Sequence, residues 1–392
     1  MATLEQLIDA VNKKKRDENK KIIISDPKKA KVFPRLPTGI FPLDRMLAGG
    51  FPIGVASCIY GREGSGKTNL LFKLISSSQK FCWQCYNYEW DCKCDKPLKL
   101  KPVLIATEIF EPEWAEKMGV DLDNLILLEP AYGEEVIDLI KYIFEADDCG
   151  LIALDSLAML TPVSELESSG GDNFIGIQAR LIRRIISLLN AKLIWAKKNN
   201  KPRMFVCTNQ IRVKIGEYGK TEEVPGGYAA KHEWHLALRM AQLSNKKEEY
   251  LDNSAKLPYV LRFKASCISE NNKKKIKILA GACEFFLCVR SGFTFPIGSP
   301  CDMDYVIKSM EEAGFIRKER EGKWILECED LNKVTTSRKE IVRELVDRWQ
   351  TNEQEYLSFK KRLVEKFIEL NEQGKVVKDD LSESTENEQE GE

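Results

Sequence analysis

Histidine is nearly absent from this chain of 392 residues, which contains only His232 and His235. Two histidines do not furnish a histidine-rich metal site, and no serine hydrolase triad can be assembled convincingly around either of them. Chemistry that relies on histidine as a general base or as a metal ligand is therefore disfavoured.

Long hydrophobic runs are also missing. The apolar stretch closest to membrane length, residues 278–289, is interrupted by Glu284 and is shorter than the roughly 20 residues that span a bilayer as a helix. The chain begins with a segment that holds Glu5 and Asp9 and has no positively charged leader before an apolar core, which argues against a signal peptide. We therefore expect a cytoplasmic protein without a membrane partner.

The formal net charge is zero, with 60 basic and 60 acidic side chains. The charge is unevenly distributed, because residues 379–392 hold seven acidic side chains and no basic one. The remainder of the chain is correspondingly basic, which is compatible with a polyanionic partner and with an acidic tail that competes for the same surface. The alternative is a tail that serves only solubility.

Length and pattern predict an α/β protein with a mostly parallel central sheet. The length corresponds to two or three domains, and short apolar runs alternate with helical stretches in the first half, as in a parallel sheet covered on both faces. Later strands without intervening helices suggest an antiparallel extension. The expected strands are 55–60, 103–107, 125–128, 151–155, 204–209, 236–240, 259–265, 275–279 and 284–289, and the expected helices include 68–78, 134–146 and 177–198.

The sequence pattern predicts four segments along the chain. Residues 1–35 form an N-terminal arm whose Leu4, Leu7, Ile8 and Val11 share one helix face, which must pack on the body or on a neighbouring subunit. Residues 36–299 form the α/β core with an insertion at 80–101, residues 300–378 a small mixed α+β domain, and residues 379–392 the acidic tail.

A phosphate-binding loop is the strongest motif in the sequence. Residues 61–68 fit G-x-x-x-x-G-K-[ST], between an apolar strand and an apolar-periodic helix. Glycines let backbone N–H groups point at phosphate oxygens, and the helix start adds a favourable dipole. We predict that the loop binds ATP, with Lys67 on the β and γ phosphates and Thr68 on Mg²⁺. The predicted nucleotide contacts are Gly61, Arg62, Glu63, Gly64, Ser65, Gly66, Lys67, Thr68 and the adjacent Asn69.

Three polar residues at expected strand ends complete a hydrolytic site. Asp155 ends a buried strand and is predicted to supply the second Mg²⁺ contact, and Glu108 follows another strand and is the candidate for activating water. Gln210 ends a third strand and opens a loop, where it could report the presence of the γ-phosphate. The alternatives are a strand-end cap for each carboxylate and an ordinary loop residue for Gln210.

Twelve cysteines in a cytoplasmic chain predict reduced thiols, a metal site or both. Cys82, Cys85, Cys92 and Cys94 lie within the insertion, and four thiolates suffice for a closed tetrahedral zinc site. A segment of this size buries too little apolar surface to order itself, so metal would supply the folding free energy. We predict one structural Zn²⁺, with reduced packed cysteines or a redox pair as the alternatives.

If zinc binds, the insertion is expected to display aromatic side chains on a rigid knob, where they could stack on bases or dock a neighbour. These side chains are Trp83, Tyr86, Tyr88 and Trp90, accompanied by Lys93, Lys96 and Lys99.

Taken together, these motifs resemble the RecA family of DNA recombinases from about residue 37 to residue 349. The segments that carry the resemblance are 36–39 (LPTG), 43–44 (LD), the phosphate loop, 116–125 (EKMGVDLDNL), 154–158 (LDSLA), 209–216 (NQIRVKIG) and 226–231 (GGYAAK). The resemblance implies a helical filament on single-stranded DNA, with ATP at subunit interfaces, that pairs this strand with a homologous duplex.

The resemblance also implies roles for individual residues. Glu108 looks like the family's catalytic glutamate, Gln210 like its γ-phosphate sensor, and Trp114, with Glu111 beside it, like the aromatic that stacks on adenine. Two DNA-binding loops are implied at residues 165–176 and 216–227. Their candidate DNA contacts are Ile175 as an apolar wedge, and Arg180, Arg212 and Lys214 on phosphates.

The sequence departs from the family pattern on a later strand, where Lys264-Ala265-Ser266 keeps at most one of two basic residues that reach a neighbour's phosphates. The leading prediction is a DNA-dependent ATPase and strand-exchange recombinase. A mediator or paralogue that binds DNA with weak or no ATP turnover and a helicase on the same fold are the alternatives.

Overall fold

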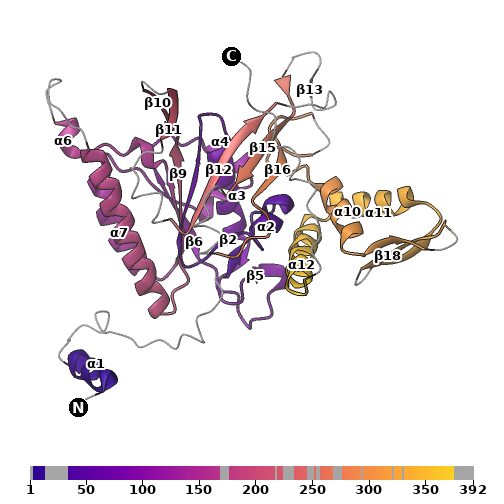
Figure 1. Cartoon of the computed structure of the whole chain (residues 1–392), viewed down its shortest axis with the longest axis horizontal. Helices are drawn as coiled ribbons and strands as arrows, with labels where there is room; N and C mark the ends of the chain where they lie inside the picture. The colour runs from indigo at the N-terminus through magenta and orange to yellow at the C-terminus, as the bar shows by residue number, and fades with distance from the viewer. Residues whose placement is uncertain are drawn as a thin grey trace.

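The structure is a computed structural model that describes residues 3–13, 34–167, 176–216, 219–223, 234–244, 251–252, 257–267, 276–292, 295–319, 322–328 and 331–374. A central eight-stranded sheet organises the chain (Figure 1). The strand order is β16 (Ala282–Cys288), β15 (Val260–Ser266), β12 (Leu236–Leu243), β3 (Ala56–Gly61), β9 (Met204–Gln210), β8 (Cys149–Asp155), β6 (Lys101–Ala106) and β7 (Ile126–Leu128).

Six neighbouring strands of this sheet, from β12 to β7, run parallel, and β15 and β16 add an antiparallel edge. The predicted α/β class with a mostly parallel sheet is therefore confirmed. All seven residues of β8 are buried, as expected for a central strand covered on both faces. The carboxyl ends of β3, β9, β8 and β6 meet at one edge, where ligands bind in such sheets.

Helices cover both faces of the sheet. The helices α2 (Phe41–Met46), α3 (Lys67–Gln79) and α4 (Pro112–Lys117) contribute side chains to one apolar core with one face of the strands. The helices α5 (Gly133–Glu145) and α7 (Ile177–Lys198) form a second core on the opposite face. The alternation of Leu151 and Ala153 into the first core with Ile152 and Leu154 into the second follows the two-residue period of a strand.

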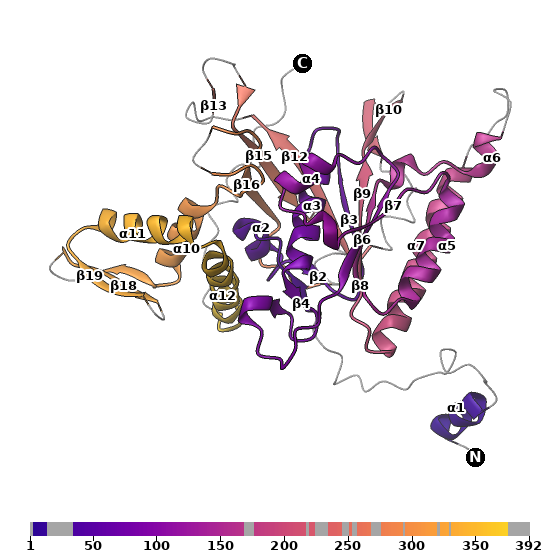
Figure 2. The same ribbon diagram turned by 180° about the vertical axis from the view of Figure 1, so that it is seen from behind.

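The C-terminal part has its own apolar core. It contains α10 (Met303–Glu312), the antiparallel strands β17 (Ile316–Lys318), β18 (Trp324–Cys328) and β19 (Leu331–Thr335), and the helices α11 (Arg338–Thr351) and α12 (Glu353–Glu372). Phe41 of α2 is part of this core. Figure 2 shows α12 lying beside α2 and the insertion, while α11 and β18 extend away from the sheet.

The remaining elements are short. The chain begins with α1 (Leu4–Lys13), which both views show apart from the sheet (Figures 1 and 2). The others are β1 (Arg35–Leu36), β2 (Phe51–Pro52), β4 (Phe81–Cys82), β5 (Asn87–Tyr88), η3 (Glu89–Asp91), η4 (Leu122–Asn124), η5 (Leu157–Met159), α6 (Val163–Leu166), β10 (Arg212–Gly216), β11 (Gly219–Glu223), β13 (Leu251–Asp252) and β14 (Leu257–Pro258). None of the helices within the described ranges has the length and apolarity needed to cross a bilayer.

Two expectations about the later strands are corrected. Residues 276–279 form no strand, although they lie within the expected strand 275–279. Their apolar side chains pack instead, with Ile276 buried in the first core and Ile278 beside it. The sequence pattern groups β12 with the antiparallel extension, but this strand runs parallel to β3 and antiparallel only to β15.

Candidate nucleotide site

The phosphate loop connects β3 to α3 at the carboxyl edge of the sheet. Gly64 and Gly66 have φ values of 72° and 80°, which side chains with a Cβ adopt at a cost. A Cβ at Gly66 would also lie 2.5 Å from Cε1 of Phe263 on β15. Glycine is therefore required at this position both by the backbone conformation and by the close approach of an aromatic ring.

Polar groups inside the loop are arranged for an anion. The ammonium group of Lys67 donates to the backbone oxygen of Arg62 at 2.8 Å and to that of Gly61 at 3.3 Å, and burial lowers its pKa. The hydroxyl of Ser65 is buried and has no hydrogen-bond partner within the described residues. A buried polar atom without a partner is costly, so the loop fits a phosphate group that would bind these donors.

The predicted Mg²⁺ ligands are in direct contact. The hydroxyl of Thr68, in the first turn of α3, donates to Asp155 Oδ2 at 2.8 Å, and Thr208 on the neighbouring strand β9 donates to the other carboxylate oxygen. Burial raises the pKa of Asp155. A hydroxyl and a carboxylate at the bottom of a phosphate loop supply the hard oxygen ligands that Mg²⁺ prefers, so these residues fit the ion.

Glu108 lies two residues after β6, and its carboxylate accepts a hydrogen bond from Ser156, the residue after Asp155. The hydroxyl of Ser156 donates to Glu108 Oε1 at 2.5 Å, and Thr107 bonds the backbone of Ser156 through its own hydroxyl at 2.7 and 2.8 Å. The Glu108 side chain is solvent-exposed, so water can reach its carboxylate. Sequence reasoning assigned no role to Ser156 or Thr107, although both adjoin a predicted site residue.

Gln210 lies beside the first residue of the phosphate loop in the sheet. Its register partner on β3 is Gly61, and the next residue, Ile211, donates its backbone N–H to the Gly61 oxygen at 3.1 Å. The side chain of Gln210 is half-buried. The position therefore connects the phosphate loop with the hairpin β10–β11, which begins two residues later.

Trp114 lies on α4 against the first apolar core, and its indole N–H donates to Asn69 Oδ1 at 2.9 Å. Glu111 is exposed immediately before α4, and Arg62 and Glu63 are exposed on the phosphate loop. The structure thus brings Trp114 next to the first turn of α3, which holds the predicted magnesium ligand Thr68.

Three of the four predicted DNA contacts lie on described elements. Arg180 is exposed in the first turn of α7, while Ile175 lies outside the described residues. Arg212 and Lys214 are alternate residues of β10, which pairs with β11 in an antiparallel hairpin. The sequence predicts that Gln210 opens a loop, but residues 212–216 form the strand β10.

The four cysteines of the insertion form one cluster. The Sγ atoms of Cys82, Cys85, Cys92 and Cys94 all lie within 4.8 Å of one another, and those of Cys85 and Cys92 are 3.6 Å apart. The spatial grouping and the soft donor set fit a tetrahedral zinc ion.

The expected display of the insertion's aromatic side chains is wrong for two of them. Trp83 and Tyr88 are 1% and 2% exposed, and Trp83 packs with Phe81 in the first core. Trp90 stacks on Tyr88 with ring centroids 4.9 Å apart, and its indole N–H donates to Ser358 Oγ of α12 at 2.8 Å. The rings are turned inward because burying them stabilises the fold more than exposing them, so the insertion attaches the C-terminal helix to the core.

A mostly parallel α/β sheet with a phosphate-loop motif between a strand and a helix is the arrangement that P-loop proteins share. A family model described as the RecA N-terminal domain matches residues 3–281, so the chain belongs to the RecA family. Similar curated proteins include those named "Protein RecA" from Francisella philomiragia subsp. philomiragia, 35% identical over 198 residues (50% of this chain, 49% of the relative), and from Nautilia profundicola, 33% identical over 216 residues (54% and 56%). The chain spans about half the length of the curated relatives that it matches.

Proposed function

We propose that this chain is a DNA-dependent ATPase and recombinase that forms filaments on single-stranded DNA and promotes homologous pairing and strand exchange. The observation that carries the proposal is the grouping of Lys67, Thr68, Asp155 and Glu108 at one edge of the sheet, beside Gln210 and the hairpin β10–β11. Membership of the RecA family supports it. Its place of action would be the cytoplasm.

In the proposed mechanism, ATP binds in the phosphate loop and supplies the phosphoryl group. Lys67 would leave the carbonyl oxygens that it contacts at 2.8 and 3.3 Å and bind the β and γ phosphates. Thr68 and Asp155 would hold Mg²⁺, and Glu108, fixed by Ser156, would accept a proton from the attacking water. Trp114 and Glu111 would lie against the base, and the remaining loop residues and Asn69 would contact the nucleotide.

DNA contact would reach the ATP site through Gln210. This residue pairs with Gly61 of the phosphate loop, and β10, which carries Arg212 and Lys214, begins two residues later. An ordered hairpin on DNA would fix the position of Gln210 against the γ-phosphate. Arg180 and Ile175, near the start of α7, would complete the DNA surface.

Filament formation is supported by the N-terminal helix. Leu7 and Val11 on one face of α1 are 53% and 45% exposed. An apolar face of this size needs a partner, and residues 1–35 are proposed as the arm that binds a neighbouring copy. The proposed core is 36–299, followed by a C-terminal domain, 300–378, and an acidic tail, 379–392.

A homologous strand-exchange assay tests the function. Exchange is expected with ATP, and electron microscopy with ATP and single-stranded DNA should show an open helix. Absence of polymer together with absence of exchange would favour a mediator with weak or no turnover, and a closed ring would favour a helicase.

The DNA surface has a separate test. We expect Arg212→Ala with Lys214→Ala to weaken binding to all single-stranded sequences and to reduce the slope of log affinity against log salt by about 0.7 for each DNA phosphate that the variant no longer neutralises. Lys141→Ala, an exposed lysine on α5, is the matched control. An unchanged slope in the double variant would contradict the assignment.

We further propose one structural Zn²⁺ on Cys82, Cys85, Cys92 and Cys94, on the basis of their common 4.8 Å cluster. Elemental analysis of protein purified without added metal should give about one zinc per chain. Well under one zinc, unchanged by Cys82→Ser, would exclude the site.

A further inference from the structure

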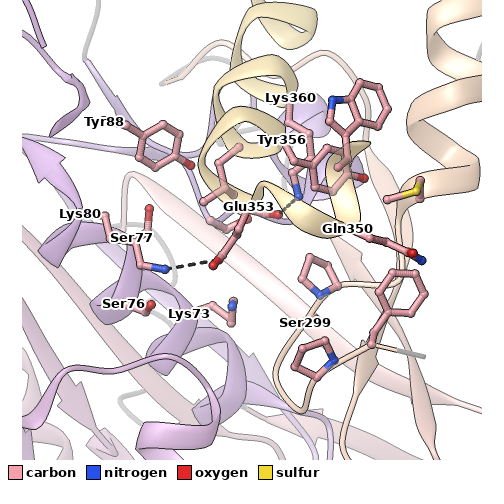
Figure 3. Close-up of a pocket in the computed structure, with 18 residues that line it drawn as sticks. Lys73, Ser76, Ser77, Lys80, Tyr88, Ser299, Gln350, Glu353, Tyr356 and Lys360 are labelled. Carbon is pink, nitrogen blue, oxygen red and sulfur yellow. Dashed lines mark hydrogen bonds and ion pairs between the residues drawn. The ribbon is translucent and has the colours of Figure 1, made fainter. Parts of the chain in front are cut away.

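A cavity of about 330 Å³ separates α3 from α12 (Figure 3). Its walls come from the second half of α3, from Tyr88 of the insertion, from residues 295–303 and from the junction of α11 and α12. The volume lies within the range of small-molecule sites, which begins at about 300 Å³.

Three lysines and one glutamate supply the charged side chains of the wall: Lys73, Lys80, Lys360 and Glu353. Lys360 is already neutralised, because its ammonium group lies 3.2 Å from Asp302 Oδ2. Lys80 lies 3.4 Å from the carboxylate of Glu353, which is 72% exposed at its side chain. The cavity therefore has a positive excess at the end formed by α3.

Lys73 accounts for that excess. Its ammonium group donates only to the backbone oxygen of Met118, at 3.4 Å, and no carboxylate among the described residues lies within ion-pair distance of it. Burial and the nearby charge of Lys80 lower its pKa to about 8, while Glu353 and Asp302 act in the opposite direction and Lys360 adds to the lowering. A partly desolvated cation without an anion is costly, and an anionic ligand would remove this cost.

The rest of the cavity is suited to an organic group rather than to a bare ion. Phe295, Pro296, Pro300, Met303 and Leu357 form an apolar portion of the wall. Ser76 and Ser77 lie at the lysine end, as Figure 3 shows. The Ser76 hydroxyl donates to the backbone oxygen of Gly119 at 2.6 Å, while the Ser77 hydroxyl is buried without a hydrogen-bond partner among the described residues. The wall thus combines a cationic, hydroxyl-bearing end with an apolar remainder.

The cavity is distinct from the phosphate loop. Lys80 is thirteen residues beyond Lys67 along the chain, and at a rise of 1.5 Å per residue this places it roughly 20 Å away along α3. The helix α3 therefore has Lys67 in its first turn, Lys73 in its middle and Lys80 immediately after its last residue.

We propose that this cavity is a second ligand site, which takes a small organic phosphate with its phosphate between Lys73 and Lys80 and its organic part against the apolar wall. The ligand would contact α3 of the core and α12 of the C-terminal part together, so binding would also stabilise the docking of α12.

Calorimetric titration of the full chain with deoxyadenosine monophosphate tests the proposal, with the phosphate loop saturated by ADP and Mg²⁺ and without DNA. We expect one binding event per chain, weakened about tenfold or more by Lys73→Gln and by Lys80→Gln. Lys141→Gln on α5 should bind like the unmodified protein. Circular dichroism establishes that each variant is folded.

A pH series gives a second readout. Because the Lys73 pKa is about 8, the ammonium form is lost as the pH rises from 7 to 9, and affinity should fall over this interval. Lys73→Arg keeps its charge at pH 9 and should remove most of the fall. No binding, binding unaffected by Lys73→Gln, or inorganic phosphate binding as tightly as the nucleotide would overturn the proposal.

Discussion

At the scale of single residues, the candidate site depends on short polar contacts between side chains that follow different strands. The carboxylate of Asp155 contacts the hydroxyls of Thr68 and Thr208, and that of Glu108 contacts Ser156. These contacts fix two carboxylates at one sheet edge, so each carboxylate is oriented before any ligand binds. Substitutions of these side chains should therefore affect the rate of ATP hydrolysis more than the folding of the chain.

Glu108→Gln should leave ATP binding nearly unchanged and slow hydrolysis by a factor on the order of 10² or more, because the amide is not a general base. Lys67→Ala should instead weaken nucleotide binding itself. Nucleotide titration and steady-state ATPase rates with single-stranded DNA measure the two effects. Unchanged turnover in the glutamine variant would contradict the assignment of Glu108.

Ser156→Ala should lower kcat about tenfold with little change in KM for ATP. The hydroxyl bonds the Glu108 carboxylate at 2.5 Å, and a hydrogen bond to a charged group is worth about 1.5–3 kcal/mol. Ser164→Ala, an exposed serine on α6, serves as control. Equal losses in kcat and in nucleotide affinity would indicate a merely structural role.

At the scale of elements, the insertion and α12 depend on each other. Trp90 and Asp91 both bond Ser358, and Asn87 bonds Lys361 of the same helix. The insertion is a loop with two two-residue strands and one short 3-10 helix, so its shape depends on the cysteine cluster. Order at the cluster is therefore coupled to the position of α12.

Ser358→Ala should loosen α12 by about 1–3 kcal/mol, because the Trp90 indole N–H and the Asp91 carboxylate lose a partner. Hydrogen exchange of α12 amides is the measurement. Ser337→Ala, before α11, is the control, since its hydroxyl makes no hydrogen bond to the residues that the structure describes.

Removal of metal from the cysteine cluster should also loosen α12, because the cluster shapes the insertion that contacts this helix. If zinc holds the cluster, a chelator should raise exchange in α12 and in the insertion while leaving α7, on the opposite face of the sheet, unchanged. Equal hydrogen exchange in α12 with and without chelator would show that the cysteine cluster does not influence this helix.

At the scale of the whole molecule, charge is segregated along the chain. Residues 379–392 are acidic and the rest is basic in balance, so the tail is expected to compete with DNA phosphates for the same surface. Truncation before Asp379 should speed loading on single-stranded DNA, most of all at low salt, where screening is weakest. Loading rates that do not differ at any salt concentration would make the tail a solubility device.

Much of the α/β core was predictable because its motifs and apolar patterns involve residues that are close together in the sequence. The phosphate loop has a fixed spacing, the apolar runs have the periods of strand and helix, and Asp155 and Glu108 follow such runs. Residues that close a strand share the sheet edge whatever the exact boundaries are. The strand boundaries themselves differed by up to three residues, as at the end of β12, since strand ends are set by pairing with neighbours.

The sequence by itself determined the α/β class, the phosphate loop and the grouping of four cysteines within one insertion, because each depends on spacing along the chain. Only the tertiary structure decided that Trp83 and Tyr88 face inward, that Trp90 bonds Ser358, and that Lys73 and Lys80 face Glu353 across a cavity. The partners in the last two cases are separated by hundreds of residues along the chain. For Trp83 and Tyr88, the sequence does not show which face of the insertion is buried. That choice is made by packing over the whole chain, since burial and charge pairing act between surfaces that meet only when the chain has folded.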